Sequence, residues 1–280
     1  MAEISAAEVM KLRNRTGLSM MECKKALVEA GADLAKAEDL LRKKLKGKMD
    51  ARTDRAAGAG RIAVAIHAKG DAATPNPHAS IVEVRAETDF TAMNEHFVAL
   101  CSKVAEMAAD APKPGATVAS EPMQAEIDKI RISTGENCSF ARGLKLQCGD
   151  GKSVFGAYVH HDGKTGALIQ GHGAITPDLL KQIGMHIVAA VPTPKGVKAD
   201  DVPAEIVARE RQFRIDQAME SGKPKEIAEK MVEGGMRKFY EEVALLEQPY
   251  IMDPSKKVKD MLPAGSQIVT FARWAVGETA

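Results

Sequence analysis

Two short stretches of the sequence carry part of a phosphate-binding loop. They read GDGKS at 149–153 and DGKT at 162–165. A loop of this kind needs a further glycine five residues before its Gly-Lys pair, so that enough backbone N–H groups converge on the phosphates. Leu146 and Tyr158 stand at those positions, and each lies in a run typical of a strand. We therefore expect hairpin turns at both stretches and no nucleotide bound by the chain itself.

Histidine and cysteine form no recognisable metal or nucleophile motif. His160 and His161 are adjacent, but no HExxH pattern and no Cys-His spacing accompanies them. Neighbouring residues of a strand point to opposite faces, so we expect the two rings not to share an ion. Neither a G-x-S-x-G pattern nor a Cys-His nucleophile can be assembled. The sequence therefore predicts no metal, no cofactor and no enzymatic activity, which leaves binding as the favoured kind of function.

An acidic and an aromatic residue stand side by side where a strand should end. The strand-like run SIVEVRA at 80–86 is followed by ETDFTAMN, which places Asp89 beside Phe90. Phe90 is one of only seven phenylalanines in the chain. Such a ring either packs into the core or is presented to a partner, and the residues alone leave both readings open.

Composition narrows the class of partner. Apolar residues make up 45% and charged residues 28% of the 280 positions, which is ordinary for a globular protein of about two domains. The net charge is +1 and aromatic residues are 4%, so we expect no nucleic-acid partner. No apolar run reaches 18 residues and no secretory signal is evident, so we expect no membrane span. The four cysteines are widely spaced without CxxC, which favours reduced thiols and a cytoplasmic location.

Three short helices are predicted in residues 1–46. Ser5 and Ser19 each begin an S-x-x-E capping box, in which side chain and backbone satisfy each other's unpaired donors. A unit of this size has a marginal core, so we expect it to depend on a partner. Residues 47–60 are polar, basic and glycine-rich, and are predicted to form a linker.

The next part of the chain repeats the order strand, strand, helix. One copy is expected in residues 61–140, and a second in 141–192 completed by 240–280. In the first copy ETDFTAMN joins the second strand to the helix, whereas GHGAITPD fills that place in the second copy. The contrast favours a specialised first loop.

Residues 193–239 are predicted to form an antiparallel helical hairpin inserted into the second half. Two charge-laced helical stretches, at 203–220 and 224–239, are separated by SGK. The apolar side chains expected to join them are Ile206, Phe213, Ile227, Met231 and Val232. Such a protrusion usually touches a partner, and a second copy of the chain is one candidate. The predicted fold class is therefore multidomain α+β.

Three stretches together resemble the elongation factor Ts family. They are LRNRTGLSMMECKKAL at 12–27, ETDF at 87–90 and SGKPKEIAEKMVEGGMRKF at 221–239, and the match covers essentially the whole chain. The resemblance implies a three-helix domain similar to ubiquitin-associated domains, two related α+β halves and an inserted hairpin. It also implies a guanine-nucleotide exchange factor that binds the translational GTPase elongation factor Tu, both GDP-bound and nucleotide-free.

The resemblance also implies which residues touch the GTPase. In the family an Asp-Phe pair meets the nucleotide-binding domain, and Asp89 and Phe90 match that pair. Other contacts come from the N-terminal helices, from a histidine and from an apolar pair in the second half. The matching positions are Arg13, Met20, Met21, Lys24, His160, Ile251 and Met252. Judged by residue type alone, each could instead be a solvated side chain or part of the core.

A non-catalytic adaptor is the alternative function. In that case the three-helix unit binds a peptide or a ubiquitin-like surface, and the hairpin only dimerises. The two functions differ in one measurable property, because only an exchange factor accelerates GDP release from elongation factor Tu.

Overall fold

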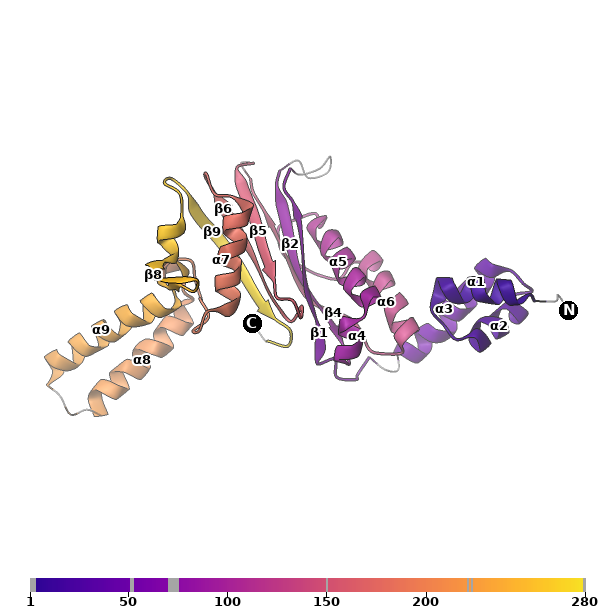
Figure 1. The fold of residues 1–280 in the computed structure, drawn as a ribbon. Helices are drawn as coiled ribbons and strands as arrows, with labels where there is room; N and C mark the ends of the chain where they lie inside the picture. The colour runs from indigo at the N-terminus through magenta and orange to yellow at the C-terminus, as the bar shows by residue number, and fades with distance from the viewer. Residues whose placement is uncertain are drawn as a thin grey trace.

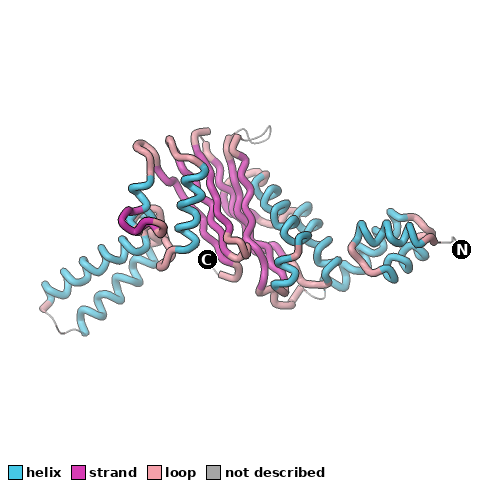
Figure 2. The backbone as a smooth tube through the Cα atoms, in the orientation of Figure 1, coloured by secondary structure: helices cyan, strands magenta, loops and turns pink. Residues whose placement is uncertain are grey.

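Two antiparallel sheets form the centre of the molecule, with helices on their outer faces (Figures 1 and 2). A small helical domain projects at the N-terminal end, and a helical hairpin projects at the other end (Figure 1). The predicted α+β class is therefore confirmed. The computed structural model describes residues 4–50, 53–69, 76–149, 151–220, 222 and 224–278.

The N-terminal domain consists of α1 (Ala6–Thr16), α2 (Met20–Glu29) and α3 (Leu34–Asp50). Both predicted capping boxes form: Ser5 and Ser19 each accept the N–H three residues on, and the glutamate there accepts the N–H of the serine. The buried side chains of the domain are Val9, Leu12, Leu18, Cys23, Ala26, Leu27, Ala37 and Leu41.

The third helix is longer than predicted. α3 continues to Asp50, so the prediction that a linker begins at residue 47 is wrong. One glycine inside a helix, Gly47, costs about 1 kcal/mol relative to alanine, and the flanking Lys, Leu and Met residues favour helix strongly enough to offset it. The other end of the predicted linker also shortens, because β1 begins at Ala59.

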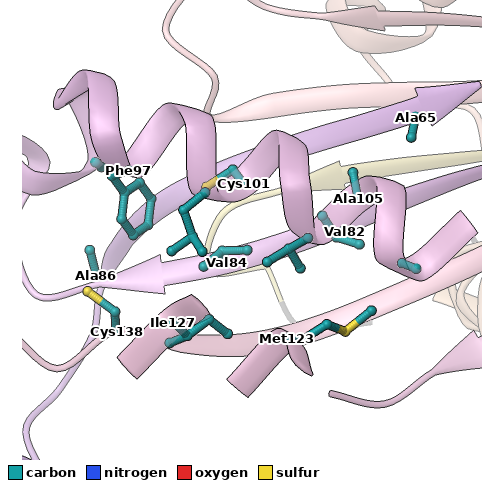
Figure 3. Packing of buried hydrophobic residues seen from close by; sticks show 14 of the residues in the cluster. Ala65, Val82, Val84, Ala86, Phe97, Cys101, Ala105, Met123, Ile127 and Cys138 are labelled. Atoms are coloured by element: carbon teal, nitrogen blue, oxygen red, sulfur yellow. The ribbon is translucent and has the colours of Figure 1, made fainter. Parts of the chain in front are cut away.

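The first sheet has the strand order β1-β2-β4-β3. Its strands are β1 (Ala59–His67), β2 (His78–Ala86), β3 (Gly115–Thr117) and β4 (Ser139–Gln147). Helices α5 (Glu95–Ala109) and α6 (Glu121–Thr134) cover its outer face, and Figure 3 shows Phe97, Val84 and Ile127 in the core between them. The predicted end of this half at residue 140 is wrong, because it cuts through β4, which pairs with β2 along its whole length. The sequence predicts neither β3 nor α6.

The second sheet has the strand order β5-β6-β9, with α7 on its outer face. The bounds are β5 (Ser153–Val159), β6 (Thr165–His172), α7 (Pro177–Ala189) and β9 (Gln267–Ala275). The predicted order of strand, strand, helix is thus confirmed in both halves. The side chains packed between the two sheets are Ile62, Ala79, Ile81, Phe155, Leu168 and Ala272.

A buried carboxylate also joins the two sheets. The Glu83 side chain, on β2, is only 1% exposed. Arg142 donates through Nε to Glu83 Oε2 at 2.7 Å, Arg85 donates to Oε1, and the Gly277 N–H donates to Oε1 at 3.0 Å. The Arg142 guanidinium lies 4.6 Å from the centre of the Trp274 ring. One anion therefore connects β2 and β4 of the first sheet with the end of β9 of the second.

The inserted hairpin consists of α8 (Ala204–Glu220) and α9 (Lys225–Val243), which is the antiparallel pair that the sequence predicts. Its contact face differs in part from the prediction, because Phe213, Ile227 and Met231 are exposed, whereas Val232 is buried and Ile206 packs half-buried against the same cluster, as predicted. The buried residues of the hairpin are Val202, Ala218, Val232, Met236, Phe239 and Val243. On α9 the buried residues follow each other at helical spacing from Val232 to Val243. The helix therefore continues past the predicted end at residue 239.

The remaining elements are short. They are α4 (Asp89–Met93), β7 (Pro249–Tyr250), β8 (Asp253–Lys257) and three 3-10 segments at Ala199–Asp201, Leu245–Glu247 and Val258–Met261. None of the helices in the described ranges is long and apolar enough to cross a bilayer.

All four cysteines are free thiols, as predicted, and all four are buried. Burial raises the pKa of the Cys101 and Cys138 thiols to about 12. Because the thiolate is the reactive form, these two side chains serve as core residues of the first half.

Candidate protein-binding site

The chain leaves β2 and forms the five-residue helix α4. The Thr88 hydroxyl caps this helix by accepting the N–H of Thr91, whose own side chain is buried. Phe90, one position earlier, is 91% exposed, and Met93, three positions further on, is 71% exposed. Residues three apart on a helix share a face, so the two apolar side chains form one patch. Of the two readings open for Phe90, the structure therefore supports a ring presented outside the core.

The backbone on both sides of Phe90 is held in place. The N–H and the hydroxyl of Thr88 donate to the two carboxylate oxygens of Glu136 at 3.1 and 2.7 Å. Beyond α4, the Asn94 side chain caps α5 by accepting the N–H of His96 at 2.9 Å. The exposed ring thus stands on a short helix that is fixed at its beginning and its end.

Asp89 links α4 to the turn between β5 and β6. Its carboxylate accepts a hydrogen bond from Lys164 Nζ at 3.0 Å, and both side chains are about half exposed. Arg61, on β1, reinforces the link, because its Nη1 lies 3.5 Å from the Ala92 carbonyl and 3.3 Å from the Asp162 carbonyl. A surface built from both halves of the core therefore surrounds the Asp-Phe pair.

The turn itself requires glycine at position 163. Gly163 has φ +73°, and a Cβ there would lie 2.3 Å from the Arg61 Cζ atom. Its carbonyl accepts the Ile62 N–H at 2.8 Å, which joins the turn to β1. The DGKT stretch is therefore a hairpin turn, as predicted. The GDGKS stretch is not a hairpin, because β4 and β5, which it connects, belong to different sheets.

The two adjacent histidines lie in this turn rather than in the strand. β5 ends at Val159, so the expectation that His160 and His161 point to opposite faces is wrong. Their ring centres are 4.2 Å apart, with the planes nearly perpendicular. His160 is half-buried, and its Nδ1 lies 3.1 Å from the Asp162 carboxylate. The predicted residue His160 is thus in the same turn as Lys164, beside the Asp-Phe pair.

The predicted N-terminal site residues are all exposed and belong to α1 and α2, and together they are called the second surface. Arg13 is exposed near the end of α1, and Met20 and Lys24 lie one turn apart on α2. Met20 is 38% exposed and Met21 is 63% exposed, so neither is part of the buried core of the domain. Both methionines are therefore accessible for contact with a partner protein.

The predicted apolar pair of the second half lies between β7 and β8. Ile251 is 45% exposed and Met252 is 65% exposed. The Ile251 N–H donates to Nδ1 of the buried His186 at 3.2 Å, and His186 Nε2 donates to the Gln248 side chain at 3.0 Å. Burial lowers the pKa of His186, against an opposing effect of the Gln248 hydrogen bond. A neutral imidazole thus positions the loop, next to a cavity of about 560 Å³ that Ile251 helps to line.

The predicted residues therefore occupy three separate exposed surfaces. Asp89 and Phe90 lie on α4, and His160 lies in the turn that Lys164 joins to Asp89. The N-terminal residues lie on α1 and α2, in the domain that projects beyond α6 (Figure 1). Ile251 lines a cavity together with residues of α7 and α9, and Met252 follows it. The structure does not bring the three surfaces into contact with one another. An arrangement of this kind suits a large protein partner better than a small ligand.

Comparison with known proteins decides the family. A family model described as "Elongation factor TS" matches residues 87–278. Elongation factor Ts from Pasteurella multocida (strain Pm70) is 43% identical over 99% of this chain and 93% of its own length. The protein of the same name from Hahella chejuensis (strain KCTC 2396) is 42% identical, with the same coverage. The chain belongs to the elongation factor Ts family.

Membership in the elongation factor Ts family assigns the chain to translation elongation in protein biosynthesis. The resemblance noted in the three sequence stretches is confirmed by these comparisons.

Sequence reasoning missed the residues that support the Asp-Phe pair. Lys164 and Arg61 are distant in sequence from Asp89, and no local pattern links them. Met93 offered a signal, because an apolar residue three positions after an exposed ring extends the same helical face. That signal is readable only once Phe90 is known to be exposed.

Proposed function

We propose that this protein is a guanine-nucleotide exchange factor that binds elongation factor Tu, in its GDP-bound and nucleotide-free states, and promotes GDP release. The observation that carries the proposal is Phe90, a phenylalanine 91% exposed on a capped helix in a member of the elongation factor Ts family. We place this function in the cytoplasm, a location that fits four free cysteines.

The Phe90 ring supplies part of the free energy. Burying it in an apolar crevice of the partner contributes about 1.5–3 kcal/mol. Changing the GDP affinity of the partner enough to reverse its nucleotide occupancy from 99:1 to 1:99 takes about 5.5 kcal/mol. The ring alone is therefore insufficient, and the contacts made by the other two surfaces supply the remainder.

Asp89 sets the register in which the ring enters. Its carboxylate already faces the β5–β6 turn, where Lys164 holds it. Hydrogen bonds from the partner to Asp89 fix the position of Phe90 relative to the magnesium and phosphate site. Disturbing the ligands of that site raises the rate at which GDP leaves.

The effect on nucleotide is reciprocal. If binding of this protein lowers the affinity of elongation factor Tu for GDP, then bound GDP lowers its affinity for this protein by the same factor. A fresh nucleotide therefore displaces the exchange factor from the nucleotide-free complex. The exchange factor is thus released and can act on another GTPase molecule.

Stopped-flow release of fluorescent GDP from elongation factor Tu tests the proposal. Wild-type chain should accelerate release at substoichiometric concentrations. Phe90→Ala should slow the accelerated release by tenfold or more, because it removes the ring while leaving the buried part of α4 intact.

Val118→Ala is the matched control, because Val118 is an apolar residue of the same half that is 83% exposed. It should release GDP at the wild-type rate. Absence of any acceleration by wild-type chain would reject the exchange function and favour the adaptor. Acceleration that Phe90→Ala leaves unchanged would reject the role of the ring.

The hairpin provides a surface for a second copy of the chain. Phe213 is 57% exposed on α8, while Ile227 and Met231, one turn apart on α9, are 49% and 38% exposed. We include self-association through these residues in the proposal. Sedimentation equilibrium of wild type and Phe213→Ser tests it, and a wild-type chain that stays monomeric at 100 μM or so would exclude it at typical dimer affinities.

A further inference from the structure

We propose that the end of the β1–β2 pair and the C-terminal turn of α5 form a binding site for one divalent transition-metal ion, with Zn²⁺ as the ion that fits its ligands. His67, His78 and Asp110 each offer a ligand atom, and these atoms lie within 4.8 Å of one another. The site is independent of the exchange function and lies at the opposite end of α5 from α4.

The strand register brings the two histidines together. His67 ends β1, His78 begins β2, and the two are direct cross-strand partners. Their rings stack with centres 4.6 Å apart and planes 11° from parallel. Asp110 follows α5 directly and approaches the pair from the helix that covers this face.

His78 provides the decisive observation. Its side chain is fully buried, and its Nδ1 lies 3.0 Å from the Asn76 carbonyl oxygen. A carbonyl only accepts, so Nδ1 carries the proton and Nε2 carries a lone pair. Among the described residues this buried Nε2 has no hydrogen-bond partner. An imidazole whose N–H is fixed by a carbonyl and whose other nitrogen is unpaired has the arrangement of a metal ligand.

His67 has the same arrangement. Its Nε2 lies 2.8 Å from the Glu106 carboxylate, which also only accepts, so in the neutral ring Nδ1 carries the lone pair. Carboxylates in this position orient ligating histidines and raise their basicity. Glu106 is thus a positioning residue, while His67, His78 and Asp110 are the ligands.

The geometry is compatible with zinc after a small closure. Three atoms at the corners of a triangle with 4.8 Å sides lie about 2.8 Å from its centre, whereas Zn–N and Zn–O bonds are about 2.0–2.2 Å. Each ligand must therefore move inward by less than about 1 Å, and the two rings must rotate so that their lone pairs converge. Two imidazoles and a carboxylate match the ligand preferences of Zn²⁺ better than those of Mg²⁺ or Ca²⁺.

Isothermal titration of the metal-stripped full-length chain with ZnCl₂ tests the proposal. Wild type should bind one Zn²⁺ per chain. His67→Ala and Asp110→Asn should each weaken binding by about a hundredfold, and Glu106→Gln by about tenfold, as expected for a positioning residue. Asp110 is exposed, so its variant keeps the fold even where a change at buried His78 would not.

His96→Ala is the matched control, because it removes an exposed imidazole from the other end of the same helix. It should bind Zn²⁺ as wild type does. The proposal is overturned if wild type binds no Zn²⁺ at 100 μM, if His67→Ala and Asp110→Asn bind as tightly as wild type, or if His96→Ala abolishes binding. Substitution of Co²⁺ gives an independent readout, because visible absorption bands should appear in wild type and be lost in Asp110→Asn.

Discussion

Replacing Glu83 with glutamine should be one of the most damaging conservative changes in the described part of the chain. The carboxylate accepts hydrogen bonds from two arginines and one backbone N–H, and it is almost completely buried. An amide keeps only one acceptor oxygen, and its NH₂ group must face a donor. Glu83→Gln therefore breaks at least one charged hydrogen bond, and because the amide is neutral, both arginines lose their counter-ion.

The magnitude follows from the burial of the partners. Removing one member of a buried ion pair costs about 3–5 kcal/mol. Arg85 and Arg142 are each 22% exposed, so water recovers part of their hydration and the lower end of that range applies. We expect Glu83→Gln to lower the free energy of unfolding by about 3 kcal/mol, which reduces the urea midpoint by up to about 1 M for a chain of this length.

Trp274 makes this measurement local. It is the chain's single tryptophan, and the Arg142 guanidinium stacks on its ring. Urea unfolding followed by tryptophan fluorescence therefore reports on the junction that Glu83 holds. Glu242→Gln is the matched control, because Glu242 lies in the same half as Trp274 and pairs with Lys238 at 4.0 Å, but both side chains are largely exposed. It should change stability by less than about 1 kcal/mol. Equal effects of the two substitutions would refute the assignment of Glu83 as a buried connector.

Three further predictions concern single positions. Gly163→Ala should destabilise the chain by about 1–3 kcal/mol, since alanine is strained at φ +73° and its Cβ meets Arg61; an unchanged urea midpoint would contradict this clash. Because burial lowers the pKa of His186, the unfolded chain takes up this proton first, so stability should be full above about pH 6.5 and fall as the pH decreases towards the folded-state pKa. Urea midpoints against pH should show a smaller fall in His186→Asn than in wild type, and equal falls would count against this cause. Gly234→Ala should stabilise α9 by about 0.5–1 kcal/mol, because nothing lies within 4 Å of the added Cβ. Gly235→Ala should raise the urea midpoint less, because its Cβ would lie 3.1 Å from the Arg214 side chain.

Features decided by neighbouring residues were predictable from the sequence. The capping boxes at Ser5 and Ser19 need only a serine and a glutamate three residues apart, and both form. The hairpin turn at Gly163 was also readable, because two strand-like runs flank it closely, whereas the missing glycine at both stretches excludes only the phosphate loop and the hairpin expected at GDGKS is not formed. The exposure of Phe90 was one of two open readings, since nothing in a strand-ending loop dictates which way a ring points.

Features decided by distant residues were not predictable in the same way. β4 joins the first sheet because it pairs with β2 across more than fifty residues, so a boundary at residue 140 separates most of β4 from its partner. His67 and His78 escape any ligand motif because a strand pairing, not a spacing, brings them together. On the hairpin, Phe213 and Ile227 are as apolar as the true contact residues, and only the pairing of α8 with α9 determines which face is buried.

The fixed backbone around Phe90 has a consequence for how fast and how tightly a partner can engage. Ordering a flexible loop costs about 1–2 kcal/mol of backbone entropy per residue, so five residues would consume more than the ring can supply. α4 is already ordered by Thr88, Glu136 and Asn94, which leaves only the torsions of the side chain to be restricted, at about 0.5–1.5 kcal/mol. Encounter with the ring is thus not delayed by a folding step, and most of its burial energy remains for distorting the partner.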